Sequence, residues 1–336
     1  ALTVNGTITA TGAVDAPAHN ISDKKITVTT FTSTGINAAI DALGSEGGEV
    51  YLPEGTYTID STITFDYDNT VLRGAGFGTY LDATSYNGHP ILISGKSNCQ
   101  VRDLYIKGSA GSGYTQNLIT DGGVLSPYFV AYNIKLEDSD GMGISWTGAG
   151  ASYGLLYNVN VDNSDTVGIY AVGGTYNKLT LCTASNCTGD GLYLSGEGSL
   201  IESCFSTLNG AIGLRGTAGN VIKSSTSLSN TGVGISCAGA DNIVSGNIVS
   251  LSGGHGIQMI GARQLVTDNI SSNNANGKVG IYLNGAPNSI VEGNHCTGAP
   301  GKEDWGIYLT NSDYCNIVGN YSTSHDNGGI HLDANS

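Results

Sequence analysis

The 336-residue chain has few cations, little proline and no long apolar run. Lysine and arginine number 13 against 28 acidic residues, giving a formal charge of -15. This balance argues against nucleic acid, because phosphate binding depends largely on basic side chains. No segment approaches the roughly 18 consecutive apolar residues that a membrane-spanning helix needs. The sequence therefore predicts neither a nucleic-acid partner nor a membrane partner.

The cysteines also lack the spacing of a metal site. None of the seven forms a CxxC pair, so zinc binding through sulfur is not predicted. Cys182 and Cys204 lie about one repeat apart and are predicted to stack inside the fold as free thiols, with a bridge between turns as the alternative. The 51 glycines and only 6 prolines are typical of many tight corners.

A glycine followed by an aliphatic residue recurs at steps of 21 to 26 residues. The nine copies are Gly143-Ile144, Gly168-Ile169, Gly191-Leu192, Gly213-Leu214, Gly234-Ile235, Gly256-Ile257, Gly280-Ile281, Gly306-Ile307 and Gly329-Ile330. Each repeat holds short alternating runs separated by Asn, Gly, Ser or Asp, which indicates strands and corners and leaves no room for a helix. Such a repeat predicts a solenoid of parallel strands.

Alternation orients the strand that follows each glycine. The first and third residues after the glycine are apolar in nearly every copy, so they are predicted to point inward and the second residue outward. The outward residues form one row along the stack: Ser145, Tyr170, Tyr193, Arg215, Ser236, Gln258, Tyr282, Tyr308 and His331.

The N-terminal part differs from the repeats. Ile36, Ala39, Ile40 and Leu43 have helical spacing, and Ser33 or Thr34 is the expected helix cap. A solenoid needs its open end covered, which this helix would do. The predicted fold is an all-β, right-handed parallel β-helix over residues 31–336 with a short N-terminal capping helix. Residues 1–30 are predicted to be an extension or attachment segment.

Three stretches carry a family resemblance: residues 36–43, 47–57 with the sequence GGEVYLPEGTY, and 71–76 with the sequence VLRGAG. Together they resemble the entry signature of pectate-lyase-like β-helix proteins, a group of polysaccharide lyases, glycoside hydrolases, mannuronan C5-epimerases and phage tailspikes. The resemblance implies a polysaccharide partner and an extracellular protein, secreted or virion-associated. It also implies a homotrimer, if the tailspike likeness holds.

Two departures from that group bear on the reaction. Mannuronan epimerases carry Asp-Pro-His where this chain has the stretch around Ser145. Residues 254–257, Gly-His-Gly-Ile, match a motif of polygalacturonases, but residues 231–234 lack the paired aspartates of that family. The resemblance therefore predicts the fold and leaves the reaction open between lyase and hydrolase.

The outward row supplies the predicted substrate contacts, which are Tyr170, Gln258, Tyr282, Tyr308 and His331. Tyrosine suits sugar faces because it combines apolar area with a polar tip. The alternative is that these aromatic rings simply stack well on a parallel sheet.

Catalysis is predicted to centre on Tyr193 and Arg215, supported by Asp190, Glu197 or His255. In a lyase, arginine neutralises the uronate carboxylate while tyrosine or histidine removes the adjacent proton. Two carboxylates across a sugar would instead indicate hydrolysis. Each residue has a structural alternative, such as a turn position for the acids and the histidine or a salt bridge for Arg215. A non-catalytic glycan-binding or structural module of a phage tail fibre, tailspike or adhesin is the alternative function.

Acidic pairs precede several of the repeat glycines. Asp138 and Asp140 could bind calcium through carboxylate and carbonyl oxygens, with solvated turns as the alternative. No other cofactor is predicted.

Overall fold

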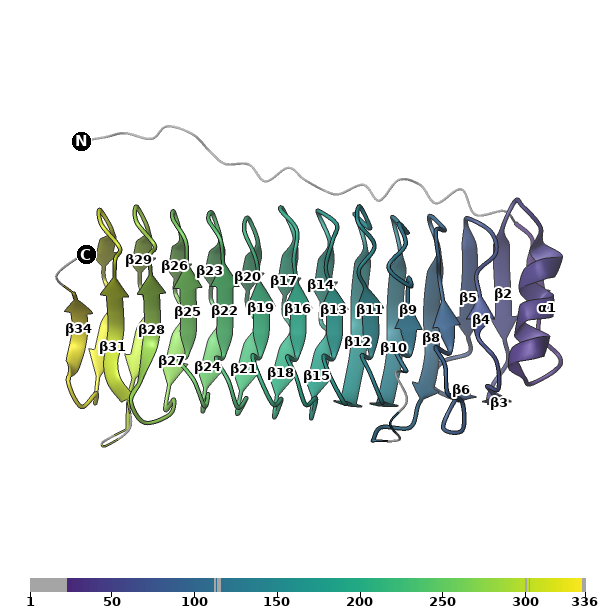
Figure 1. The fold of residues 1–336 in the computed structure, drawn as a ribbon, viewed down its shortest axis with the longest axis horizontal. Helices are drawn as coiled ribbons and strands as arrows, with labels where there is room; N and C mark the ends of the chain where they lie inside the picture. Colours follow the sequence, from purple (N-terminus) through teal and green to yellow (C-terminus); the bar gives the residue numbers. More distant parts are fainter. Residues whose placement is uncertain (1–22, 112, 114–115, 300, 302, 334–336) are drawn as a thin grey trace.

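The computed structural model describes residues 23–111, 113, 116–299, 301 and 303–333, which form one helix and 34 strands. The strands coil into a stack of turns in which each strand pairs in parallel with its equivalent one turn away (Figure 1). Ile144 pairs with Ile169, and Ile169 with Leu192, so the glycine-led repeat is the structural repeat. The predicted all-β solenoid is confirmed.

The twelve strands of sheet B comprise the nine of the glycine-led repeats and three that precede the first repeat glycine. They are β4 (Ile63–Thr64), β7 (Ile91–Leu92), β9 (Ile119–Thr120), β11 (Ile144–Trp146), β13 (Ile169–Ala171), β16 (Leu192–Leu194), β19 (Leu214–Gly216), β22 (Ile235–Ala238), β25 (Ile257–Ile260), β28 (Lys278–Asn284), β31 (Glu303–Thr310) and β34 (Gly328–Leu332).

The other 22 strands form sheet A, which wraps the remaining two faces of the coil. Its first face contains β1 (Lys25–Thr27), β2 (Gly48–Leu52), β5 (Thr70–Gly74), β8 (Gln100–Lys107), β10 (Val130–Ser139), β12 (Leu155–Ser164), β14 (Lys178–Thr180), β17 (Leu200–Glu202), β20 (Val221–Lys223), β23 (Ile243–Ser245), β26 (Leu265–Thr267), β29 (Ile290–Glu292) and β32 (Asn316–Val318). Strands β8, β10 and β12 continue onto the second face, where they join β3 (Gly55–Thr58), β6 (Thr79–Asp82), β15 (Thr183–Ser185), β18 (Phe205–Thr207), β21 (Thr226–Leu228), β24 (Ile248–Ser250), β27 (Ile270–Ser272), β30 (His295–Thr297) and β33 (Tyr321–Thr323).

The interior of the coil is the core, and the predicted alternation places its residues correctly. Ile144, Leu192, Leu214, Ile235 and Ile257 are all fully buried. Their outward neighbours pair with one another from turn to turn as a continuous row. The predicted inward assignment is confirmed, and so is the outward one at the partly exposed row positions, whereas Ser145 and Ser236 are buried.

Polar ladders fill the corners between strands. In sheet A, Gly246, Asp268 and Gly293 have φ of 62°, 56° and 66°, which turns the chain and directs the next side chain inward. The residues that follow include Asn269, whose amide oxygen accepts hydrogen bonds from the backbone nitrogen (3.0 Å) and the side-chain nitrogen (2.9 Å) of Asn247. Asn269 in turn donates to the Asn294 side-chain oxygen at 3.0 Å. These buried amides satisfy one another along the coil axis.

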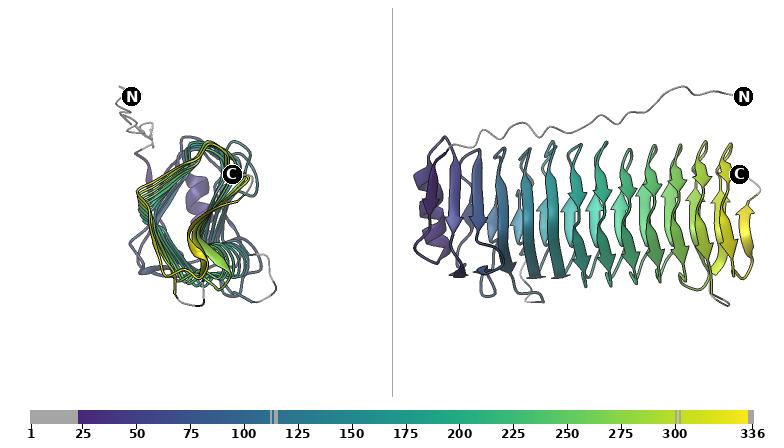
Figure 2. Two further views of the ribbon diagram at one scale, coloured as in Figure 1. Left: turned by 90° about the vertical axis from the view of Figure 1, so that its left-hand side faces the viewer. Right: turned by 180° about the vertical axis from the view of Figure 1, so that it is seen from behind.

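Helix α1 (Ser33–Leu43) covers the N-terminal end of the coil, as predicted (Figure 2). Its cap is Thr32 and not Ser33 or Thr34, because the Thr32 hydroxyl accepts a hydrogen bond from the backbone nitrogen of Gly35 at 3.2 Å. Ser33 is buried and bonds to Asp60 instead. Strand β1 already pairs with β2, so strand pairing starts within the predicted 1–30 extension, whose residues 1–22 lie outside the described residues.

Two of the cysteines confirm the prediction made for them. Cys182 and Cys204 are buried and free, with no bridge between their turns. Within the described ranges, no helix is long and apolar enough to cross a membrane.

Candidate functional site

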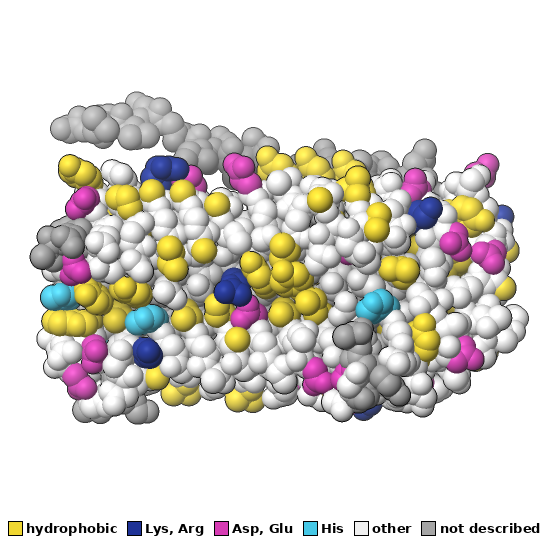
Figure 3. All heavy atoms as spheres, in the orientation of Figure 1, with side chains coloured by type: hydrophobic (Ala, Val, Ile, Leu, Met, Phe, Trp, Pro, Cys, Tyr) yellow, Lys and Arg dark blue, Asp and Glu magenta, His cyan; other side chains and the backbone are white. Residues whose placement is uncertain are grey.

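The outward row lies on one long side of the coil, the side that faces the reader in Figures 1 and 3. Viewed along the axis, the outline of the coil bends inward on this side (Figure 2). Ser145 and Ser236 occupy positions in the row yet are only 6% and 8% exposed. In Figure 3 side chains of the hydrophobic class, in which tyrosine is included, run along this face, with one basic and one acidic side chain close together near its middle.

Asp190, Arg215 and Tyr193 form a cluster in the middle of the row. An Arg215 guanidinium nitrogen lies 2.7 Å from Asp190 Oδ2, and the guanidinium carbon lies 4.9 Å from the Tyr193 ring centroid. Tyr193 also contacts Tyr170 edge-on, with ring centroids 5.1 Å apart. The structure thus brings together three of the five predicted catalytic residues.

Asp190 is held as a hydrogen-bond acceptor on both oxygens. Its Oδ1 accepts from the backbone nitrogen of Ile212 at 2.9 Å, while Oδ2 accepts from Arg215, and its side chain is 8% exposed. The salt bridge considered as the structural alternative for Arg215 therefore exists. Since both oxygens are engaged with donors, Asp190 positions Arg215 and is poorly placed to deliver a proton itself.

Glu197 stays apart from this cluster. It is exposed in the turn that follows β16, and its side chain lies beside Gly219 of the next turn. No contact joins Glu197 to Arg215 or Asp190 within the described part of the chain. It therefore takes the corner position that was its structural alternative.

His255 lies three turns beyond Asp190, at the same position directly before a repeat glycine. Its Nδ1 accepts a hydrogen bond from the backbone nitrogen of Val279 at 3.1 Å. An amide nitrogen can only donate, so Nδ1 carries no proton and the neutral ring carries its proton on Nε2. Burial, helped by the charge of Lys278, lowers the pKa of His255 to about 4. His255 is therefore a neutral hydrogen-bond donor and not a ready general base.

The low pKa of His255 predicts a pH-dependent stability. The unfolded chain takes up a proton near the ordinary pKa of 6.5, whereas the folded chain resists it until about pH 4, so stability falls as the pH falls through this window. Between pH 7 and pH 4, we expect the free energy of unfolding to fall by about 2 kcal/mol less in His255→Asn than in the parent. The asparagine side-chain oxygen can still accept the hydrogen bond from the backbone nitrogen of Val279. Asn117 makes the equivalent contact elsewhere in the coil, where its oxygen accepts from the backbone nitrogen of Met142 at 2.8 Å. Urea unfolding at both pH values, run on parent and variant, measures the difference; equal pH dependence would contradict the assignment.

The C-terminal half of the row is aromatic. Tyr282 lies between His255 and Tyr308, with ring centroids 4.7 Å and 5.5 Å away. His331 contacts Tyr308 edge-on at 4.9 Å and stacks on Trp305 at 4.3 Å. Sequence reasoning missed Trp305, whose only signal is its place directly before Gly306. Gln258 lies between Ser236 and Tyr282 in the same row.

The predicted calcium residues Asp138 and Asp140 both take part in other contacts. The Asp138 carboxylate lies 2.9 Å from Lys107 Nζ and accepts from the Asn163 side chain at 2.6 Å. Asp140 is buried and accepts from the backbone nitrogen of Gly113. Among the described residues, no group of three or more His, Cys, Asp or Glu could hold a metal ion. Calcium binding by Asp138 and Asp140 stays a prediction.

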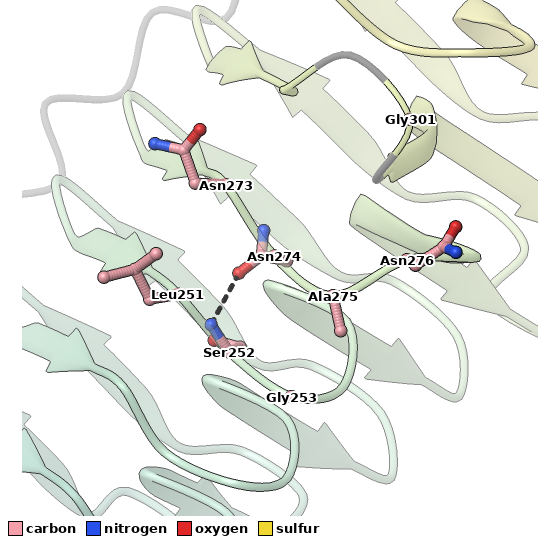
Figure 4. A pocket seen from close by; sticks show the side chains of 8 residues that line it. All are labelled: Leu251, Ser252, Gly253, Asn273, Asn274, Ala275, Asn276 and Gly301. Carbon is pink, nitrogen blue, oxygen red and sulfur yellow. Dashed lines mark hydrogen bonds between the residues drawn. The ribbon is translucent and has the colours of Figure 1, made fainter.

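A shallow depression lies away from the row, at the corner between sheet A and sheet B (Figure 4). Its lining residues are Leu251, Ser252, Gly253, Asn273, Asn274, Ala275, Asn276 and Gly301. None of these can donate or remove a proton near neutral pH, and the Asn274 side chain is already bonded to the Ser252 backbone nitrogen at 3.2 Å. This depression is not a catalytic pocket.

Comparisons with known proteins agree on the fold. A family model described as "Right handed beta helix region" matches residues 142–277 and 211–336, together more than half of the chain. No curated protein sequence gives a match. The predicted right-handed parallel β-helix is confirmed.

Several solved structures are similar to the chain at low identity. The A-module of the mannuronan C-5 epimerase AlgE4 from Azotobacter vinelandii is 18% identical, with a TM-score of 0.76 over 90% of this chain and 93% of that one. The catalytic domain of a GH87 α-1,3-glucanase, in complex with tetrasaccharides, is 16% identical, with a TM-score of 0.59 over 93% and 68%. The ORF18 protein of Geobacillus virus E2 is 14% identical, with a TM-score of 0.53 over 92% and 61%. At such identities the similarity shows the fold alone.

Proposed function

The chain belongs to the right-handed β-helix family, and from this premise we propose that it binds a polysaccharide along the outward face of sheet B. The observation that carries the proposal is the unbroken outward row from Ser145 to His331, in which tyrosines flank a central arginine. A linear polymer with repeating units matches a linear site whose side chains recur once per turn. The structural relatives named for mannuronan and α-1,3-glucan support the same class of ligand.

Replacing Tyr282 and Tyr308 together by alanine tests the binding proposal. The two rings lie on the outward surface, so the double variant should fold and lose about 10-fold or more in affinity for the best-bound oligosaccharide. Tyr132→Ala is the matched control, because Tyr132 stacks on Tyr157 on sheet A, away from the row. Calorimetric titration measures both. Equal affinities for parent and double variant would make the tyrosines structural.

Cleavage of the bound polysaccharide is a second candidate function. Tyr193 favours it, because its hydroxyl forms no hydrogen bond with another described residue while its ring lies against the Arg215 guanidinium. Tyr193 would move a proton and Arg215 would stabilise negative charge as it develops. Without such turnover, the chain would act as a glycan-binding or structural module of a tail fibre, tailspike or adhesin. We also propose that the protein is extracellular, either secreted or virion-associated, and that it forms a homotrimer.

A further inference from the structure

The one permanent charge in the outward row of sheet B is compensated before any ligand arrives. The outward row has twelve positions, Thr64, Leu92, Thr120, Ser145, Tyr170, Tyr193, Arg215, Ser236, Gln258, Tyr282, Tyr308 and His331. Arg215 is the one permanent charge among them, and its guanidinium is bonded to the Asp190 carboxylate at 2.7 Å. A carboxylate on a sugar would have to compete with Asp190 for Arg215.

The remaining polar groups of the face are suited to hydroxyl groups. His255 is neutral above about pH 4 and presents its Nε2 proton as a donor. Gln258 offers a donor and an acceptor, and the tyrosine hydroxyls offer both. Asp190 uses one nitrogen of Arg215, and the other guanidinium N–H groups are donors for a neutral acceptor.

The net charge of the whole chain also disfavours an anionic polysaccharide. With a formal charge of -15, the protein repels a polyanion at a distance, and a local cation cluster would be needed to reverse that field. Among the described residues, Lys278, the first residue of β28, is the other cation next to this part of the face, and a single lysine is not such a cluster.

We propose that sheet B selects an uncharged polysaccharide, a glycan without uronic acid or sulfate groups, and that the Asp190–Arg215 pair sets this selectivity. The inference rests on the proposed polysaccharide binding. It also bears on the reaction, because elimination by a lyase requires the carboxylate of a uronic acid. An uncharged polysaccharide would therefore exclude elimination.

Calorimetric titration of the whole chain with two sets of oligosaccharides tests the inference. The neutral set comes from dextran, galactomannan and inulin, and the anionic set from alginate and polygalacturonate. We expect a neutral oligosaccharide to bind tightest. Its affinity should change less than about threefold between about 0.1 M and about 1 M salt, a range that shortens the screening length from about 10 Å to about 3 Å.

Asp190→Asn is the decisive variant. The asparagine oxygen can still accept from Ile212, but its nitrogen cannot accept from Arg215, which is then released as a free cation. We expect affinity for an anionic oligosaccharide to rise about tenfold or more at low salt and to fall back at high salt. Lys278→Gln is the control and should leave neutral binding unchanged.

The outcomes separate the two proposals. If the parent binds alginate or polygalacturonate tighter than every neutral oligosaccharide, and high salt or Lys278→Gln abolishes that binding, the inference is overturned while polysaccharide binding stands. If Asp190→Asn folds and gains no anionic affinity, the role of the pair is overturned. Binding of neither set would remove the proposed function itself.

Discussion

Asn269→Leu is expected to destabilise the coil by about 3–5 kcal/mol, because it breaks a buried ladder of amides. Asn269 is fully buried and donates to the carbonyl oxygen of Val244 at 2.8 Å and to Asn294 at 3.0 Å. Its own oxygen accepts from both nitrogens of Asn247. Leucine leaves these donors and acceptors without partners in a place that water does not reach, and each such group costs about 1–3 kcal/mol.

The matched control is Asn316→Leu, the same substitution at an outward position of β32, where the side chain is exposed. Its expected effect is within about 0.5 kcal/mol of the parent. Chemical unfolding followed by circular dichroism compares the three proteins. If Asn269→Leu were as stable as the control, the amide ladder would contribute little and the apolar core would hold the corners alone.

Tyr193→Phe is expected to lower turnover by about 10²- to 10⁴-fold on any polysaccharide that the parent cleaves, because the hydroxyl that moves the proton is lost. The phenyl ring keeps the contacts with Arg215 and Tyr170, so the melting temperature should hold. Arg215→Ala should lose turnover to a similar degree, since it removes the charge that stabilises the transition state.

Arg215→Ala needs a companion variant, because it leaves the nearly buried Asp190 carboxylate without its partner and destabilises the cluster. The double variant Asp190→Asn/Arg215→Ala removes both charges and should recover stability without recovering turnover. Initial rates of reducing-end release, together with the absorbance of unsaturated products, follow both reaction types. Near-parental rates for Tyr193→Phe and the double variant would place the reaction elsewhere on the chain.

The candidate site was predictable from sequence to the extent that it depends on register. Tyr193 and Arg215 lie at the same position of successive repeats, so the parallel pairing of β16 with β19 places them side by side. Trp305 was missed because it precedes the glycine, at a position that is mostly apolar in the other repeats and reads as ordinary packing. Thr32 was missed as the helix cap because Ser33 and Thr34 are equally suitable residue types, and only the backbone geometry distinguishes them.

The sequence by itself determined the coil, its register and the direction of each strand side chain, because in a solenoid every turn contacts mainly its neighbours and the alternation has a period of two. The tertiary structure decided what the polar side chains at the corners do. Asp190 accepts a hydrogen bond from the backbone nitrogen of the residue 22 positions later, and His255 from that of the residue 24 positions later. These fixed hydrogen bonds determine what the two side chains can do. No local pattern encodes that choice, because it depends on the direction of one side chain relative to the next turn.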